Sequence, residues 1–325
     1  MKILTWLRCS AENLHVGNYL GAVKPLTELA KSWETFLMLA DTHSLSTVHD
    51  GEQMRKNKRS VLLDYCALIP DETLLSPNFF IFEQSKIRRL MDIFWILSSV
   101  TPYSLILRSH AFKDSQAKNS DINMAVFNYS ILMTADIITY DIDFVPVGKD
   151  QQQHIEFARD IAQFFNTTYK TDIFKLPTGK IADDIGLIPG LDGRKMSKSY
   201  DNYIGVFEEE SVLKKKIMSI PTDQTPLEAP KNPDTDNVFA LIKFFADPQR
   251  TEAIHQKYLA GGYGYGHAKL ELLEIILDFT AEFRKKRALL ESDFSQVEKI
   301  LQRWNARANE QADKKYLQLK DIIGL

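Results

Sequence analysis

Short apolar runs alternate with helical patterns along the first two thirds of the chain. The apolar runs occupy residues 3–7, 36–40, 79–82 and 144–147. Strands that are covered on both faces are continuously apolar, so these runs predict buried parallel strands. Between them, apolar residues recur at intervals of three and four, as at Ile87, Leu90, Phe94 and Leu97. The alternation predicts an α/β fold with a doubly wound parallel sheet.

Each predicted strand is followed directly by a polar cluster. The clusters are Arg8-Cys9-Ser10, Asp41-Thr42-His43, Glu83-Gln84-Ser85 and Gly148-Lys149-Asp150-Gln151. In open α/β sheets, ligands bind just outside the carboxyl ends of the strands. The sequence therefore places all four clusters at the edge of the sheet where a ligand site is expected.

After about residue 205 the pattern becomes helical, without strand-like runs. Leu272, Ile276, Phe279 and Phe283 share one helix face, for example. This predicts an all-helical C-terminal region. It carries two basic clusters, residues 214–216 and 284–287. Such runs are either solvated helix faces or local patches that meet a polyanion, and the pattern alone leaves both readings open.

Composition narrows the class of protein. The 325 residues are 44% hydrophobic and 26% charged, with a net charge of −3, which is typical of a globular protein and excludes disorder. The two cysteines, Cys9 and Cys66, exclude a disulfide framework and a cysteine-rich zinc site. No apolar run is long enough for a membrane span, and no secretion signal is recognisable at the N-terminus. We therefore expect a cytoplasmic protein that does not enter a membrane.

The segment His15-Val16-Gly17-Asn18 follows the first predicted strand and opens a helix. A helix N-terminus offers unpaired N–H groups to a phosphate, Gly17 permits close approach of a nucleotide, and His15 can donate to a phosphate oxygen. A simple helix cap explains the same residues equally well. Pro25 should kink or shorten this first helix.

A second segment, Gly190-Leu191-Asp192-Gly193-Arg194-Lys195-Met196-Ser197-Lys198-Ser199, carries the stronger signal. Such a loop can close over a triphosphate, with lysine ammonium groups neutralising the charge that develops on departing pyrophosphate. No catalytic triad, metal-ligand cluster or carboxylate pair is needed for a reaction of this type.

Together the two segments resemble the signature elements of class I aminoacyl-tRNA synthetases, of the His-Ile-Gly-His and Lys-Met-Ser-Lys-Ser types. The stretches 127–137 and 145–154 narrow the resemblance to bacterial tryptophanyl-tRNA synthetases, over nearly the whole chain. The resemblance implies a Rossmann-like catalytic domain over residues 1–204 and a helical anticodon-binding domain over 205–325, part of which packs on the catalytic core. It also implies activation of L-tryptophan with ATP and Mg²⁺, transfer to tRNA(Trp), a homodimer, and no tightly bound cofactor.

The resemblance further assigns roles to individual residues. Asp136 would accept the indole N–H, a contact that rejects analogues lacking the donor by roughly 10⁴–10⁵-fold. The other residues implied for tryptophan are Tyr129, Met133, Gln151 and His43. The residues implied for ATP are Ser10, Gly17, Asn18, Gly148, Lys149, Asp150, Ile188, Lys195, Met196, Ser197, Lys198 and Ser199. His15, Lys195 and Lys198 would act on the phosphates. We expect the Asp136 end and the lysine loop to face one common cleft.

The sequence departs from the family in the loop after the first strand. Residues 9–13 read Cys-Ser-Ala-Glu-Asn, one residue longer than usual, and Trp6-Leu7 stand where glycine is common. ATP contacts from Arg8, Cys9 and Ser10 are therefore weak expectations. Three other functions stay open on the sequence: a tyrosyl-tRNA synthetase, a small nucleotidylyltransferase, and a catalytically silent RNA-binding or regulatory relative.

Overall fold

Five parallel strands form one sheet in the order β3-β2-β1-β4-β5. The structure, a computed structural model, describes residues 1–9, 14–109, 113, 122–147, 152–181 and 188–325. The strands are β1 (Lys2–Leu7), β2 (Glu34–Leu39), β3 (Phe79–Glu83), β4 (Phe144–Val147) and β5 (Thr178–Ile181). The first four were predicted; β5 was not. Strand order reverses between β1 and β4, where Ile3 pairs with Phe144, so the ligand crevice of a doubly wound sheet is expected there.

Helices connect the strands. They are α1 (Val16–Asn18), α2 (Lys24–Ala30), α3 (Asp41–Ser44), α4 (Gly51–Leu68), α5 (Asp71–Leu74), α6 (Leu90–Val100), α7 (Tyr103–Ile106), α9 (Met124–Phe127), α10 (Tyr129–Ile138) and α11 (Gln152–Thr168). Ile87 lies before α6 and not within it, because a 3₁₀ turn (η2, Gln84–Lys86) intervenes. Pro25 has the predicted effect: a π-helical turn over Tyr19–Val23 separates α1 from α2, and the proline stands at the start of α2, where its missing N–H costs nothing.

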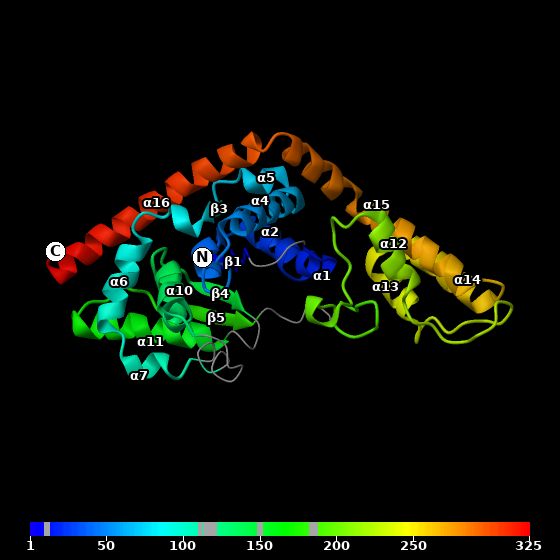
Figure 1. The fold of residues 1–325 in the computed structure, drawn as a ribbon, viewed down its shortest axis with the longest axis horizontal. Coiled ribbons are helices and arrows are strands. Elements are labelled where there is room, and N and C mark those ends of the chain that lie inside the picture. Colours follow the sequence, from blue (N-terminus) through cyan, green and yellow to red (C-terminus); the bar gives the residue numbers. More distant parts are fainter. Residues whose placement is uncertain (10–13, 110–112, 114–121, 148–151, 182–187) are drawn as a thin grey trace.

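Residues 205–325, all of which the structure describes, contain helices and no strand of the sheet, as predicted. The helices are α12 (Glu210–Met218), α13 (Asn237–Phe245), α14 (Pro248–Ala260), α15 (Tyr265–Ser292) and α16 (Ser295–Ile323). Figure 1 shows α12, α13 and α14 in a lobe apart from the sheet, with α15 leading back and α16 crossing the sheet lobe. Within the described residues, no helix is both long and apolar enough to cross a membrane.

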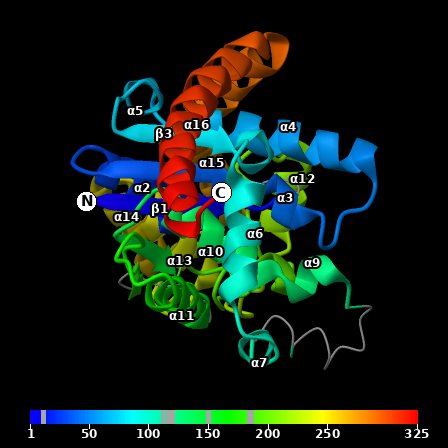
Figure 2. The same cartoon turned by 90° about the vertical axis from the view of Figure 1, so that its left-hand side faces the viewer.

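The long helix α16 covers β3, which is the edge strand of the sheet (Figure 2). Residues 79–82 are completely buried although they lie at an edge, because α16 shields them. Trp304 of α16 is fully buried, packs its ring 5.0 Å from that of Phe80, and donates its indole N–H to the carbonyl of Leu74 at 3.1 Å. The last helix is therefore part of the core of the sheet lobe.

The basic cluster at residues 284–287 fastens α15 to its neighbours. Three of its side chains bind groups elsewhere in the chain: Arg284 the carbonyl of Glu208, Lys286 the carbonyl of Ile69 and the carboxylate of Asp71, and Arg287 the carboxylate of Asp64. Only Lys285 of the four is fully exposed. The sequence left two interpretations of this cluster open, a solvated helix face and a patch that binds a polyanion such as RNA. These contacts fit neither interpretation.

Candidate functional site

The residues around His15 form a tight cap at the end of the first loop. The His15 Nδ1 accepts the backbone N–H of Asn18 at 3.3 Å, and the Asn18 side-chain oxygen accepts the backbone N–H of His15 at 3.2 Å. Burial lowers the pKa of His15 to about 4, and the charge of nearby Lys198 adds to the effect. The ring is therefore neutral at pH 7. Because Nδ1 accepts, the proton sits on Nε2, which remains a donor.

Gly17 leaves room for the His15 ring in this cap. A Cβ atom at Gly17 would lie 2.8 Å from the His15 ring and 3.5 Å from the sulfur of Met196. Any larger residue would therefore displace the His15 ring from its capping position. Met196 itself is buried, whereas Lys195 is exposed and Lys198 partly so. The methionine anchors the loop and leaves its lysines available to solvent.

Asn202 holds the lysine loop in shape. Its side-chain oxygen accepts the N–H of Ser197 at 2.7 Å, and its amide donates to the carbonyl of Lys195 at 3.0 Å and to Asp192 at 2.6 Å. Asn202 is 3% exposed. Sequence reasoning did not single it out, because nothing in the local pattern shows that its amide turns back on the loop.

Two backbone hydrogen bonds join the His15 segment to residues 204–206, which follow the lysine loop in the chain. Val16 donates to Ile204 and Val206 donates to Leu14, each at 2.9 Å, so the segments pair like antiparallel strands. The two motifs that lie almost 180 residues apart in sequence thus meet in one structure. A phosphate chain placed against His15 Nε2 would also lie within reach of the loop.

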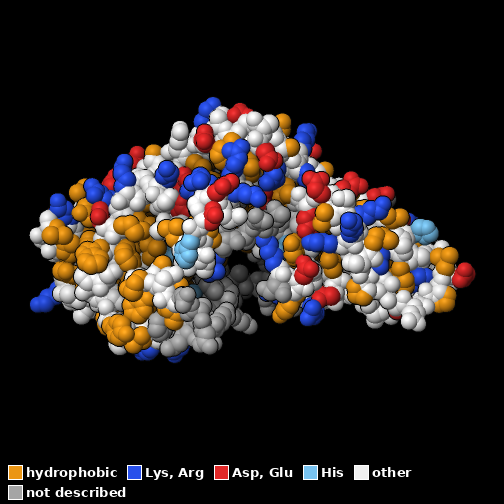
Figure 3. Space-filling view, viewed as in Figure 1, with side chains coloured by type: hydrophobic (Ala, Val, Ile, Leu, Met, Phe, Trp, Pro, Cys, Tyr) orange, Lys and Arg blue, Asp and Glu red, His pale blue; other side chains and the backbone are white. Residues whose placement is uncertain are grey.

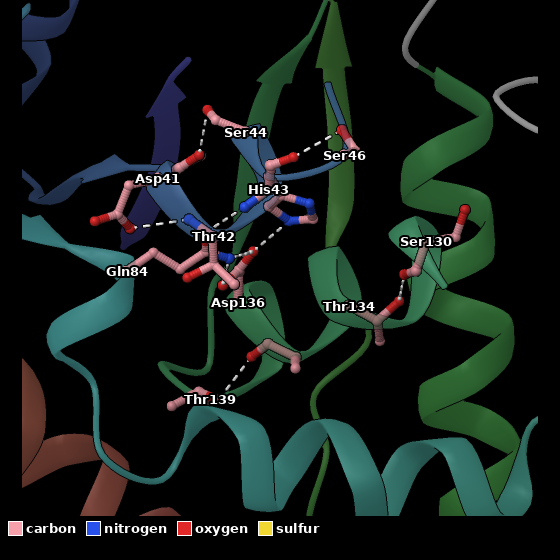
Figure 4. Close-up of polar contacts among 12 residues, drawn as sticks. Asp41, Thr42, His43, Ser44, Ser46, Gln84, Ser130, Thr134, Asp136 and Thr139 are labelled. Atoms are coloured by element: carbon pink, nitrogen blue, oxygen red, sulfur yellow. Dashed lines mark hydrogen bonds and ion pairs between the residues drawn. The ribbon is translucent and has the colours of Figure 1, made fainter. Parts of the chain in front are cut away.

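At the other end, Asp136 lies at the bottom of a hydrogen-bonded cluster (Figure 4). His43 Nε2 lies 2.9 Å from Asp136 Oδ2, and the Gln84 amide nitrogen lies 2.9 and 3.0 Å from the two carboxylate oxygens. Burial raises the pKa of Asp136, while hydrogen bonds from His43 and Gln84 oppose that rise. The several donors around the carboxylate hold it in one orientation.

Tyr129 and Met133 share α10 with Asp136. The Tyr129 ring centre lies 4.2 Å from that of His43, and Arg8, at the end of β1, hydrogen-bonds to the Tyr129 side chain. Met133 is 2% exposed and belongs to the hydrophobic core. His43, Tyr129 and Asp136 therefore form a continuous wall next to the carboxyl end of β1.

Two cavities lie near these residues. The first, of about 260 Å³, is lined by Thr42, His43, Leu45, Met91, Phe94, Met124, Ala125, Asn128 and Leu132. The second, of about 350 Å³, is lined by Leu20, Lys24, Pro25, Glu28, Ile188 and Phe244. Ile188, predicted for ATP, thus lies between the first helix and α13. Asp136 is not among the residues that line the first cavity.

Some predicted site residues lie outside the described residues: Ser10, Gly148, Lys149, Asp150 and Gln151, and the side chain of Ser199. In the described part of the chain, no three His, Cys, Asp or Glu side chains group as they would around a metal ion.

A short stretch of chain links the His43 end of the site to the His15 end. Cys9 donates its N–H to the Ser44 hydroxyl beside His43, and Leu14 precedes His15. Five residue steps separate Cys9 from Leu14, so their Cα atoms lie at most about 18 Å apart. Figure 3 shows a hollow between the sheet lobe and the lobe of α12–α14, the place where the expected common cleft would lie.

Comparison with known proteins identifies the family of the chain. A family pattern described as tRNA synthetases class I (W and Y) matches residues 1–280. The tryptophan–tRNA ligase of Fusobacterium nucleatum is 43% identical over 312 residues, covering 96% of this chain and 94% of that one. The crystal structure of Campylobacter jejuni tryptophanyl-tRNA synthetase, complexed with ADP and tryptophan, superposes with a TM-score of 0.94 at 37% identity, over 100% of both chains. The tryptophanyl-tRNA synthetase of Mycoplasma pneumoniae superposes with a TM-score of 0.76 at 25% identity, over 100% of this chain and 97% of that one. The chain therefore belongs to the class I tRNA synthetases and, within them, to the tryptophan–tRNA ligase family.

Proposed function

We propose that the chain activates L-tryptophan with Mg-ATP to tryptophanyl-adenylate and pyrophosphate, and then transfers tryptophan to the 3′ end of tRNA(Trp). One observation supports the proposal above all: the buried carboxylate of Asp136 is held in place by His43 and Gln84, as a contact to an indole N–H would require. An indole ring has one N–H donor and otherwise apolar surface, and these residues suit both parts of it.

The first step needs positioning and charge neutralisation. The carboxylate of tryptophan attacks the α-phosphorus of ATP, a new O–P bond forms, and the bond from that phosphorus to the pyrophosphate oxygen breaks. His15 Nε2 would donate to a phosphate oxygen as a neutral ring, and Lys195 and Lys198 would offset the charge on pyrophosphate. Mg²⁺ enters with ATP as part of the substrate.

The remaining residues keep the roles that the family resemblance gives them. Gly17 and Asn18 border the nucleotide beside His15, and Met196 and Ser197 hold the lysine loop against it. Ser10, Gly148, Lys149, Asp150, Ile188 and Ser199 are assigned to ATP, and Gln151 to the α-ammonium group of tryptophan.

We assign residues 1–204 to ATP and tryptophan, and the helical residues 205–325 to the anticodon, with α16 contributing to the catalytic half. The contacts of α16 with β3 support the second part of this division. A ligase that uses cytoplasmic tRNA belongs in the cytoplasm, and the two buried free thiols suit that reducing compartment.

We also propose a homodimer, formed by the face that carries α6, α7 and α9. Large apolar side chains are exposed there: Trp95 by 74%, Tyr103 by 68% and Met124 by 67%. Figure 2 shows α6 at the front of this face, and Figure 3 shows hydrophobic side chains gathered at this end of the sheet lobe. Exposed apolar patches of this kind mark protein interfaces. Trp95→Asp should convert the dimer to monomer in analytical ultracentrifugation, whereas Leu259→Asp, on α14, should not.

ATP–pyrophosphate exchange, measured separately with tryptophan and tyrosine, tests the function. Stimulation by tryptophan alone supports the proposal. Stimulation by tyrosine alone would favour the tyrosyl enzyme, which shares the family pattern. No adenylate in a single turnover at saturating ATP would favour the silent relative.

Asp136→Ala should abolish most of the preference for tryptophan over other aromatic amino acids; unchanged kinetics would refute the assignment of the pocket.

A further inference from the structure

We propose that Gln84 is a positioning residue for tryptophan recognition, and that the C-terminal helix α16 holds Gln84 in place. The inference rests on the proposed function, because it concerns how Asp136 is presented to the indole N–H. Gln84 directly follows β3, and its side chain points toward the carboxylate of Asp136, which lies on α10 (Figure 4).

The Gln84 side chain has one possible orientation. Its amide nitrogen donates to both Asp136 oxygens, and its amide oxygen accepts the backbone N–H of His43 at 3.1 Å. Turning the amide over would place oxygen against a carboxylate and nitrogen against an N–H donor, so the reverse orientation loses every bond. Gln84 is 1% exposed, so water cannot replace these partners.

The acceptor capacity of Asp136 can be counted. Each carboxylate oxygen accepts about two hydrogen bonds. Oδ2 receives Gln84 and His43, whereas Oδ1 receives Gln84 alone. When the carboxylate is ionised it only accepts, and His43 Nε2 then carries the hydrogen of the bond between them. One acceptor position on Oδ1 is therefore left among the described contacts, and we assign it to the indole N–H.

Helix α16 brackets Gln84 from both sides. Asn305 accepts the N–H of Glu83 at 2.9 Å and donates to the Glu83 carboxylate at 3.1 Å. One turn later, Asn309 accepts the N–H of Arg88 and donates to the carbonyl of Lys86, both at 2.9 Å. Two asparagines on one helix face thus hold the backbone immediately before and after Gln84.

A partly buried ion-pair cluster ties this segment to the helix that carries His43. Lys58 lies between Glu83 at 2.9 Å and Asp41 at 2.5 Å, and Asp41 accepts the backbone N–H of Ser85 at 2.9 Å. Asp41 begins α3, two residues before His43. The two donors that hold Asp136 therefore come from segments fixed to each other and to α16, so a shift of α16 would be transmitted to the carboxylate.

The test compares tryptophan with an analogue whose indole nitrogen is replaced by sulfur, β-(3-benzothienyl)-alanine. Gln84→Met keeps the side-chain length and removes the donor. We expect kcat/KM for tryptophan in ATP–pyrophosphate exchange to fall about 10- to 100-fold, the loss expected for one hydrogen bond to a charged group. The analogue makes no N–H contact, so its kcat/KM should change far less, and KM for ATP should stay the same.

The pH profile supplies a readout that a general loss of structure would not move. The groups around Asp136 are His43 and Asp41 on α3, and Tyr129 and Tyr140 on and after α10. Removing the Gln84 donor should raise the pKa of Asp136. The pH below which activity toward tryptophan is lost should therefore be higher in Gln84→Met than in the wild type. An acid limb that stays in place, with equal losses for both substrates, would overturn the proposal.

The contribution of α16 has its own variants. Asn305→Ala should lower the preference for tryptophan over the analogue by a smaller factor, and Gln302→Ala, exposed on the same helix, should leave the preference unchanged. If α16 acts through Gln84, adding Asn305→Ala to Gln84→Met should reduce the preference little further. Fully additive losses would show that α16 does not act through Gln84. Lack of exchange in the wild-type chain would instead refute the proposed function.

Discussion

The pairing of Arg287 with Asp64 gives the sharpest test of how the two lobes are joined. Asp64, on α4, is 1% exposed; its carboxylate accepts the Arg287 guanidinium at 2.7 Å and the backbone N–H of Leu14 at 3.4 Å. Arg287→Met keeps most of the packing of the side chain but leaves that carboxylate buried with no cation bonded to it. Breaking a buried pair from one side costs about 3–5 kcal/mol. Since the Arg287 side chain is 19% exposed, we expect about 3 kcal/mol, the lower end of that range.

Urea denaturation of the full chain would measure this loss, with Lys285→Met as the matched control. Lys285 is exposed on the same turn, so its replacement should change the free energy of unfolding by less than about 0.5 kcal/mol. An Arg287→Met chain that is as stable as the wild type, but charges tRNA poorly, would refute the reasoning and restore the RNA-patch reading of this cluster.

The same pair predicts a pH dependence. Burial raises the pKa of Asp64 even with Arg287 present. A carboxyl group with a raised pKa stabilises the fold fully below its unfolded pKa, and that stability is lost as pH rises through the folded pKa. Removing Arg287 raises the folded pKa further, so the difference in stability between wild type and Arg287→Met should be small at acid pH and largest at neutral pH.

The remaining predictions concern the phosphate end and α16. Lys195→Ala should slow adenylate formation about 10²–10³-fold in single-turnover experiments, while the Kd for tryptophan from equilibrium dialysis stays the same; an equal loss in both would indicate a structural role. Because the pKa of His15 is lowered to about 4, its neutral form adds stability above its ordinary value of 6.5 that is lost as pH falls toward 4, and His15→Gln should weaken that part of the acid destabilisation in urea titrations. Trp304→Ala should lower the free energy of unfolding by about 3–5 kcal/mol, because the ring is fully buried against Phe80, whereas Trp304→Phe, which keeps a smaller aromatic ring but loses the bond to Leu74 and part of the buried volume, should cost about 2–3 kcal/mol.

Features that depend on the local sequence pattern could be predicted. Four strands were found because they are continuously apolar, and β5 was missed because Thr178-Gly179-Lys180-Ile181 is short, polar and glycine-containing. The two signature segments that carry the family resemblance are likewise contiguous in the chain, so the family could be identified from the sequence.

Residues whose role depends on distant partners were not predictable. Glu83-Gln84-Ser85 was recognised as a polar cluster, but its contact with Asp136 spans 52 residues. The partner of Arg287 lies 223 residues away, so the sequence could not distinguish a buried ion pair from a solvated or RNA-binding charge. In both cases the missing information was the packing of one element on another, which periodicity does not encode.

The contacts of α16 change how the two halves of the chain should be regarded. A boundary at residue 204 separates the sheet from the helices by composition, yet α16 lies along the edge strand β3 and contributes to its burial. Without α16, four consecutive apolar residues and the backbone of an edge strand would face water, a combination that favours aggregation. The same helix places Asn305 and Asn309 against the backbone on either side of Gln84, the residue that we propose positions Asp136 for tryptophan. Helix α16 thus belongs to the sheet lobe by packing, whereas α12–α14 and the beginning of α15 stand apart from the sheet in Figure 1. A chain cut at the compositional boundary should therefore lose both the solubility of the sheet and its selectivity for tryptophan.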